Sequence, residues 1–231
     1  MARVARVVVP GYPHHVTQRG SRKQKTFFSA DDYHHYRWLL GTRRRDSGLQ
    51  IWAWCLMPNH VHLVVVPDHE KSLARFCADV HRRYAYRTNT REGWRGHLWQ
   101  ERFRSFVMDE EHLLAAVRYV ELNPVRAGLC ETPTQWPWSS VHAHLAGRSD
   151  DVVSVEPMLQ RISDWHAYLA AGLPEPLTET LRRHTRTGRP AGDAAFLSRM
   201  EKLTGRRLRK GKPGPKGAGR QNSRCPHDSD K

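Results

Sequence analysis

The sequence predicts an α+β protein with a ferredoxin-like sheet, in which elements follow the order β-α-β-β-α-β and a further helix follows the fourth strand. Two observations support this prediction. Short runs rich in β-branched residues alternate with segments whose apolar residues recur at helical spacing. The 231 residues, of which 39% are hydrophobic, also suffice for one sizeable domain with appendages.

The first predicted strand is short and leads into a basic loop. The His-Val-Thr run at 15–17 favours a strand that ends at Gly20. The loop 21–25 that follows is basic and suited to contact phosphate. Ser29, followed by Asp31 and Asp32, predicts the start of a helix, because these side chains complement the exposed N–H groups of the first turn. Gly48 ends this helix.

The centre of the predicted sheet carries two histidines. Residues 49–56 form the second strand, which turns at 57–59 into a third, β-branched run closed by proline. Side chains alternate between the two faces of a strand. His60 and His62 therefore share one face, about 6–7 Å apart along the strand, while Val61 enters the core on the other.

The second half of the predicted sheet repeats the pattern. A helix is expected over 72–87, a strand over 97–108, and a helix over 110–122 that begins after the N-cap Asp109. Asn123-Pro124 ends that helix, because the residue before proline avoids the α region. The ferredoxin-like topology puts the helices on one face. It also makes the first and third strands central, which would leave the histidine pair in mid-sheet on an open face.

The remaining residues predict a smaller helical part and a tail. We expect three parts: a main domain at 1–147, a helical C-terminal extension at 148–208, and a disordered basic tail at 209–231 that adds non-specific electrostatic affinity. The expected helices after the main sheet lie at 136–147, 163–171, 179–184 and 193–203.

Charge predicts a nucleic-acid partner. Lys and Arg number 38 against 23 Asp and Glu, which gives a formal net charge of +15. An anionic membrane is the rival partner, but the sequence shows no long apolar span and no amphipathic lysine helix, so we expect no membrane association. Four scattered cysteines without C-x-x-C spacing argue against a zinc ribbon or disulfide framework and fit a reducing cytoplasm.

The histidine pair admits two interpretations. Two solvated histidines on a half-exposed strand are the commoner meaning of an arbitrary His-x-His. Here the pair adjoins a strongly apolar segment, where an unpartnered polar group is costly, and this favours a metal site. A tyrosine hydroxyl can attack a phosphodiester when a metal polarises the phosphate. The product of this attack is a covalent phosphotyrosine, which stores the energy of the broken phosphodiester bond for rejoining. We therefore expect no nucleotide cofactor, and the sequence contains no Walker-type loop.

Several segments resemble the single-tyrosine transposases, whose HUH motif is His, hydrophobic, His. The subgroup with the greatest resemblance is the REP-associated tyrosine transposases, relatives of insertion-sequence transposases. A lone His-x-His is a weak signal, but the motifs in this order and at this separation are a strong one. The resemblance covers roughly 5–145, and the similar segments are 15–20, 57–63, 119–129, 138–140 and 188–193.

The resemblance implies a metal-dependent single-strand DNA endonuclease and strand transferase in the main domain. Tyr119, on the helix after the fourth strand, would be the nucleophile that leaves a 5′-phosphotyrosine. His60 and His62 would hold Mg²⁺ or Mn²⁺, with Asn123 as the third ligand. Two imidazoles suit manganese better than magnesium. Tyr84 and Tyr86 are rival nucleophiles, which we expect to stack or pack instead.

The resemblance also implies the partners. The substrate would be single-stranded DNA that forms hairpins from palindromic REP elements, in DNA transposition, recombination or repeat processing. The protein would act as a monomer or homodimer in the bacterial cytoplasm, associated with the nucleoid. Candidate phosphate contacts are Arg19, Arg22, Arg102, Arg104 and Arg126.

Two other functions compete with this one. A non-catalytic, sequence-specific nucleic-acid-binding protein could use the same topology, as RNA-recognition (RRM-like) modules do, but their aromatic strand motifs are missing from the sequence. A zinc hydrolase would need a His-Glu-x-x-His helix, which is also missing.

Overall fold

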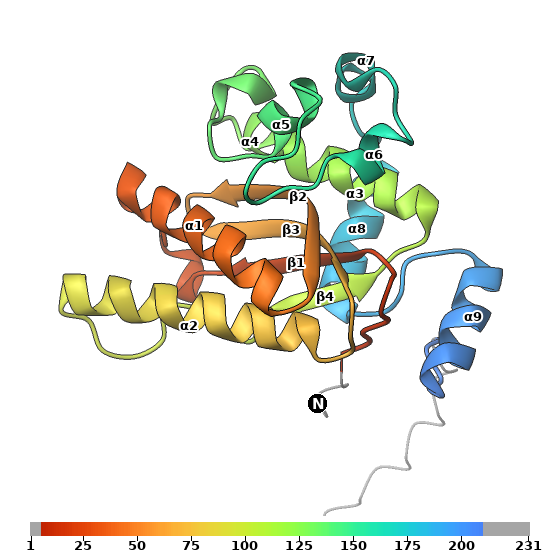
Figure 1. Cartoon of the computed structure of the whole chain (residues 1–231), viewed down its shortest axis with the longest axis horizontal. Coiled ribbons are helices and arrows are strands. Elements are labelled where there is room, and N and C mark those ends of the chain that lie inside the picture. Colours follow the sequence, from red (N-terminus) through yellow and green to blue (C-terminus); the bar gives the residue numbers. More distant parts are fainter. Residues whose placement is uncertain (1–5, 210–231) are drawn as a thin grey trace, which may run out of the picture.

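The computed structural model describes residues 6–209, and its strands form one antiparallel sheet in the order β2-β3-β1-β4 (Figure 1). The strands are β1 (His14–Arg19), β2 (Leu49–Met57), β3 (His60–Pro67) and β4 (Arg104–Val107). β1 and β3 are adjacent at the centre, as the ferredoxin-like prediction requires. The fold class predicted from the sequence is therefore confirmed.

The fourth strand is much shorter than predicted. The sequence predicts a strand over 97–108, whereas β4 covers only Arg104–Val107. Leu98, Trp99 and Phe103 are buried in the core beside α2, and this apolar content resembles that of a strand. Their backbone instead follows the end of β1 as a loop, with one isolated bridge between Gly20 and Trp99.

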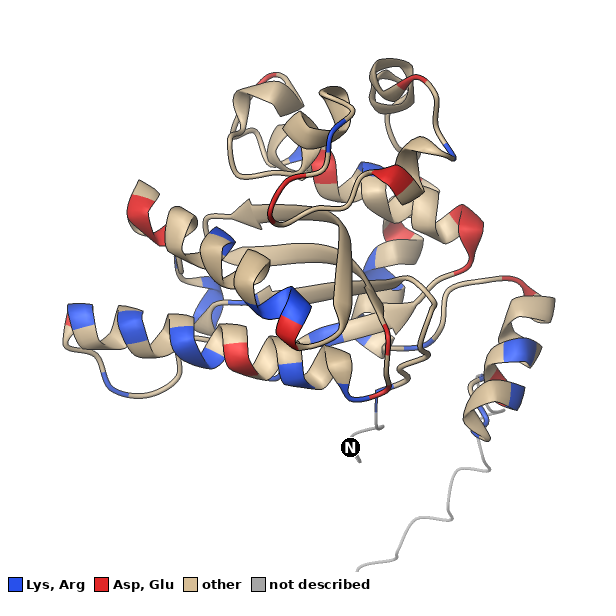
Figure 2. Cartoon of the chain, viewed as in Figure 1, with Lys and Arg blue, Asp and Glu red and all other residues tan. Residues whose placement is uncertain are grey.

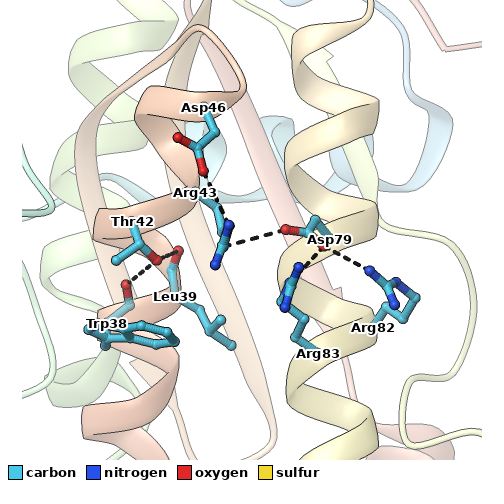
Figure 3. A network of polar contacts seen from close by, with 8 residues as sticks. All are labelled: Trp38, Leu39, Thr42, Arg43, Asp46, Asp79, Arg82 and Arg83. Atoms are coloured by element: carbon cyan, nitrogen blue, oxygen red, sulfur yellow. Dashed lines mark hydrogen bonds and ion pairs between the residues drawn. The ribbon is translucent and has the colours of Figure 1, made fainter.

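Helices α1 (Ala30–Asp46) and α2 (Ser72–Glu92) cover one face of the sheet (Figure 1). Val61 and Val16 enter this core from β3 and β1. Asp79 of α2 accepts a hydrogen bond from Arg83 at 2.8 Å, and its other oxygen lies 3.5 Å from Arg43 of α1 (Figure 3). These pairs are partly exposed, so they orient the two helices more than they stabilise them.

The opposite face is covered as well, which corrects the expectation of an open face beside the histidines. Helix α3 (Glu110–Glu121) packs on β2 and β3, and α8 (Glu175–Thr187) packs on β4 and β1. Apolar residues of α3 form a second core with Ala53, Cys55 and Val64 from the sheet. The histidines thus lie between the sheet and these helices, where His62 is buried and His60 is partly exposed.

Helices α7 (Trp165–Ala170) and α9 (Ala194–Thr204) lie within two residues of their predicted bounds, and α8 is longer than expected at both ends. The helix expected over 136–147 is much shorter than predicted, because only α5 (Val141–Leu145) is helical there. Ala191 donates its N–H to the carbonyl of Val107 at 2.8 Å and bridges to Met108, so the 188–193 segment follows the end of β4. Gly192 is required there, because a Cβ would lie 2.3 Å from the ring of Phe196. The other helices are η1 (Ser21–Lys23), α4 (Asn123–Arg126), η2 (Pro133–Gln135) and α6 (Glu156–Leu159).

Two sequence-based expectations concern parts at the limits of the structure. The predicted basic tail, 209–231, lies outside the described residues apart from Arg209. Within 6–209, no helix is both long enough and apolar enough to cross a membrane.

Candidate active site

Strand register assembles the first part of the site. Arg19 of β1 pairs with His60 of β3, and Thr17 pairs with His62. On the other side of β1, Arg104 of β4 is also opposite Thr17. Residues opposite one another in antiparallel strands share a face. One patch of the sheet therefore presents two imidazoles flanked by two guanidinium groups.

Helix α3 brings Tyr119 against the histidines. Its start is fixed by Asp109, whose carboxylate accepts the N–H of His112 at 2.9 Å. The ring centroid of Tyr119 lies 5.5 Å from that of His62. The guanidinium carbon of Arg126, from α4, lies 4.7 Å from the Tyr119 ring centroid. The structure thus brings together the tyrosine and one histidine singled out in the sequence.

A third histidine, which sequence reasoning did not assign to the site, orients His62. Nε2 of His15 is 3.0 Å from Nδ1 of His62, and the two rings stack with centroids 5.2 Å apart. In the other histidine of the pair, His60, Nδ1 lies 2.6 Å from Oδ1 of Asn59. Each histidine of the pair is therefore held through Nδ1. Nε2 of His62 is buried and has no hydrogen-bond partner among residues 6–209.

All three imidazoles are neutral at physiological pH. Burial lowers the pKa of His60 to about 4, with a further contribution from the charge of Arg19. Burial also holds the pKa of His62 well below its usual value, assisted by the nearby His60, His15 and arginines. The pKa of His15 is lowered to about 3 by burial. Neutral imidazole is the form that binds a metal, so no proton has to be displaced near pH 7.

The histidine pair has the chemistry to hold a divalent cation. Metal-bound histidines commonly use one ring nitrogen for the metal and the other for an orienting hydrogen bond, which is the arrangement of His60 and His62. Asn123 is buried at the start of α4, and its Nδ2 has no hydrogen-bond partner in the described part of the chain. No group of three His, Cys, Asp or Glu side chains in the described chain is placed to hold a metal. A third ligand would thus be of another kind.

His60, His62 and Tyr119 line a cavity of about 430 Å³ that also carries several basic side chains. Arg19, Arg102 and Arg104 line it as candidate phosphate contacts, whereas Arg22, Arg126 and Asn123 are not among its lining residues. A larger cavity of about 730 Å³ lies beside α2 and lacks the histidine pair and Tyr119. The smaller cavity is lined by Thr17, Gln18, Arg19, Lys23, His60, His62, Gln100, Glu101, Arg102, Arg104, Tyr119, Arg182 and Thr185.

Arg182 is a site residue that the sequence analysis missed. It comes from α8, far along the chain, and lines the cavity together with Tyr119. Its guanidinium donates hydrogen bonds to Glu179 at 2.6 Å and to Glu175 at 3.0 Å, and it also interacts with the side chain of Tyr119. Nothing in the local sequence distinguishes Arg182 from the other arginines of its helix.

The rival tyrosines of α2 lie elsewhere. Tyr84 is fully buried, and its hydroxyl donates a 2.6 Å hydrogen bond to the carbonyl of Thr26. Burial raises the pKa of that hydroxyl far above its usual value. Tyr84 therefore packs, as expected. Tyr86 is 75% exposed and does not line the cavity.

A buried carboxylate anchors α3, the helix that carries Tyr119. Glu121, two residues after Tyr119, is fully buried. It accepts hydrogen bonds from Ser140 at 2.6 Å and Trp165 at 2.9 Å, and lies 2.6 Å from Nδ1 of His144. The hydroxyl of Ser140 is also bonded to the backbone of β2. One side chain thus connects α3 to β2, α5 and α7.

Replacing Glu121 with alanine is expected to destabilise the fold strongly. Three buried groups would lose their acceptor, which costs about 3–5 kcal/mol in comparable buried pairs. Urea unfolding measures the difference. The matched control is Glu110→Ala on the same helix, because Glu110 is 59% exposed and its ion pair with Arg161 lies at the surface. That variant should lose at most about 1 kcal/mol. Equal losses in both variants would contradict a central role for Glu121.

Comparison with known proteins adds a family and a fold. A family model described as "Transposase IS200 like" matches residues 9–123. The chain is 21% identical over 126 residues to the REP-associated tyrosine transposase of Escherichia coli (strain K12), covering 54% of this chain and 74% of that protein. A solved structure of a REP-associated tyrosine transposase bound to a REP hairpin shares the fold, with 21% identity and a TM-score of 0.54. That match covers 67% of this chain and 92% of the other.

Proposed function

The chain belongs to the IS200-like transposase family, and from this premise we propose that it cleaves and rejoins single-stranded DNA with Tyr119 as the nucleophile. One observation carries the proposal. Tyr119 lies 5.5 Å, between ring centroids, from a histidine whose Nε2 is buried and unpartnered. Both residues line a cavity whose other walls carry Lys23 and several arginines. The candidate nucleophile, a candidate metal ligand and the candidate phosphate contacts thus line one cavity.

In the proposed reaction the hydroxyl oxygen of Tyr119 attacks the phosphorus of a phosphodiester. The bond from phosphorus to the 3′ oxygen breaks, which leaves a free 3′-hydroxyl and a 5′-phosphotyrosine. The hydroxyl of Tyr119 loses its proton, and the leaving 3′ oxygen gains a proton. The reverse attack by a 3′-hydroxyl rejoins a strand, and no nucleotide cofactor is consumed.

His60 and His62 are the proposed holders of Mg²⁺ or Mn²⁺, through Nε2 of each ring, with Asn123 as the proposed third ligand. When bound, such an ion polarises the phosphate and offsets the charge that develops on it. Imidazole ligands favour manganese over magnesium. The orienting contacts at Nδ1 keep both rings aimed without help from the metal.

The arginines of the cavity would bind the phosphates on either side of the cleavage point. Arg19 and Arg104 flank the histidines on the sheet, and Arg182 approaches from α8. Arg104 already pairs with Glu101, so it has to exchange that partner for a phosphate. Arg126 would act differently, by holding the ring of Tyr119 through a cation–π contact.

The proposed substrate is a DNA hairpin formed by a palindromic repeat, with single-stranded flanks. The solved relative is bound to a REP hairpin, and the charge of this chain suits such a partner. We propose that the protein acts on DNA in the cytoplasm, as a monomer or a homodimer.

The alternative is a non-catalytic DNA-binding protein on the same sheet. Such a module needs an accessible sheet face with aromatic residues, whereas α1, α2, α3 and α8 cover both faces here (Figure 1). Incubation of an end-labelled single-stranded hairpin with the protein and Mn²⁺ separates the functions. A covalent protein–DNA adduct supports the transposase chemistry. Cleavage without an adduct indicates a hydrolase, and binding without cleavage indicates the non-catalytic module.

Binding is expected to weaken steeply with salt, because counterions are released from each phosphate that is neutralised. Residues 210–231 contain six Lys and Arg against two Asp. Deleting them should lower both the non-specific affinity and the slope of log K against log salt, by about 0.7 per lost phosphate contact on single strands. The deletion keeps Arg209, which bonds to α9. Preference for a hairpin over an unstructured strand, measured by fluorescence anisotropy, should persist. Loss of that preference would show that the tail reads the DNA.

A further inference from the structure

An exposed pair of aromatic rings lies outside the cavity. Phe28, before α1, and Trp94, after α2, are each 42% exposed. Their ring centroids are 5.5 Å apart with the planes at 83°. Arg91 lies 5.9 Å from the Phe28 ring and is anchored by two hydrogen bonds to the buried Asp32. The rings are therefore held in place while much of their surface faces solvent.

Two segments run side by side from the cavity to this pair. Gln100 donates its N–H to the carbonyl of Arg19 at 2.9 Å, where both residues line the cavity. One step further out, Ser21 donates its N–H to the carbonyl of Leu98 at 2.8 Å and its hydroxyl to that of His97 at 2.7 Å. From there, one segment continues to Phe28 and the other leads back to Trp94. The start of α1 and the end of α2 lie at the same end of the molecule (Figure 1).

This path carries only positive charge. Segments 20–28 and 93–100 contain four Lys and Arg and no Asp or Glu. All four cations are exposed, and lysines or arginines mark both segments in Figure 2. The four are Arg22, Lys23, Lys25 and Arg95. An anionic strand leaving the cavity would thus meet cations along the whole path.

The path is short on the scale of DNA. Lys23 lines the cavity and Phe28 is five residues further on, so their Cα atoms are at most about 18 Å apart. Stacked nucleotides rise about 3.4 Å each along a strand. The aromatic pair therefore lies within roughly five stacked nucleotides of the cavity.

We propose that Phe28 and Trp94 form a stacking site for an unpaired base of the DNA strand that leaves the catalytic cavity over the basic segments. This inference rests on the proposed function, because it takes the cavity as the place where DNA is bound. An aromatic face bordered by cations suits a nucleotide, which presents a flat base beside a phosphate. A stack of this kind tolerates any base, so it would grip the strand without reading sequence.

The test measures binding at equilibrium, in chelator, so that it does not depend on cleavage. The full chain is titrated into a labelled twelve-nucleotide oligothymidylate, and in parallel into an abasic oligomer of the same length and charge. Trp94→Ala should weaken oligothymidylate binding about 5- to 150-fold, the range for loss of one base–aromatic stack. Its binding of the abasic oligomer should change less than about twofold.

Three further variants and one control variant make the result decisive. Trp94→Phe keeps an aromatic face and should retain most of the affinity. Phe28→Ala should resemble Trp94→Ala, and the double variant should be little worse than either, because two rings that hold one base act as a unit. The matched control is Trp38→Ala: Trp38 is 54% exposed on α1, on the side away from α2 (Figure 3). It should bind both oligomers normally.

Two results would overturn the inference. One is an equal loss of affinity for the thymidylate and abasic oligomers in Trp94→Ala, which would mean that only the charged path was disturbed. The other is unchanged thymidylate binding in Trp94→Ala and Phe28→Ala. Neither result bears on the proposed strand-transfer chemistry, which is tested separately by the covalent adduct of the wild-type chain.

Discussion

Replacing Tyr119 with phenylalanine is expected to abolish the covalent protein–DNA adduct while leaving hairpin binding nearly intact. The substitution removes only the hydroxyl, so the ring keeps its packing against His62 and under Arg126. Loss of a nucleophile lowers turnover by about 10⁴-fold or more. The side chain of Tyr119 also interacts with Arg182. Losing the hydroxyl should weaken DNA binding by no more than a few-fold, because Arg182 stays paired with Glu175 and Glu179.

A denaturing gel with end-labelled single-stranded hairpin DNA detects the adduct, and anisotropy in chelator measures binding. Tyr86→Phe is the matched control, because Tyr86 is 75% exposed and lies outside the cavity. It should form the adduct at the wild-type rate. An adduct that persists in Tyr119→Phe would identify another tyrosine as the nucleophile. An adduct lost in both variants would mean that the substitutions act through binding or folding.

The elements that the sequence predicts well are those whose residues report on local physics. Alternation along β3 places Val61 in one core and the two histidines on the other face, and the structure confirms this. Helix α3 ends at Glu121, one residue before the predicted end, but the expected cause is wrong: Asn123 does not avoid the helical region, because it begins α4 together with Pro124. The fourth strand is predicted too long because the prediction uses only the local apolar content of the sequence. Trp99 and Phe103 are apolar because they pack beside α2, and apolar content alone does not distinguish such a loop from a strand.

The parts of the site that the sequence does not predict depend on long-range pairing. His15 reaches His62 only because β1 and β3 pair in one particular register. Arg182 joins the cavity because α8 returns to cover the sheet, although the sequence favours a separate extension. Glu121 gains its partners from α5 and α7, which follow it by 19 to 44 residues. Such contacts leave no periodic pattern in the chain.

Removing either histidine of the pair is expected to lower DNA cleavage by about 10²- to 10⁴-fold. A cation held by two ligands loses its place when one is lost, and several kcal/mol of charge stabilisation are lost with it, at a factor of ten per 1.36 kcal/mol. His60→Ala and His62→Ala should each show the defect, and the double variant should be little worse, because the two rings act as one unit. Single-turnover cleavage of a labelled hairpin in Mn²⁺ measures the rates.

The two variants differ in their cost to the fold. His60 is only partly buried, so its loss should leave the free energy of unfolding almost unchanged. His62 is 5% exposed and bonded to His15, so His62→Ala leaves a buried nitrogen unpartnered and should cost about 1–3 kcal/mol. His60→Ala is therefore the cleaner test of the metal. His166→Ala, which removes an exposed histidine on α7, should affect neither the rate nor the stability.

Chelation of the wild-type chain should reproduce the defect of His60→Ala, and Mn²⁺ should restore cleavage at least as well as Mg²⁺, because imidazole nitrogens bind manganese more readily. Asn123→Ala should be milder than either histidine variant, because a neutral amide is a weak ligand. In chelator, His60→Ala and the wild type should cleave at the same low rate, since neither then holds a cation. Full cleavage by the wild type in excess chelator, or wild-type rates in the double histidine variant, would remove the metal from the mechanism and leave Tyr119 without its main source of charge stabilisation.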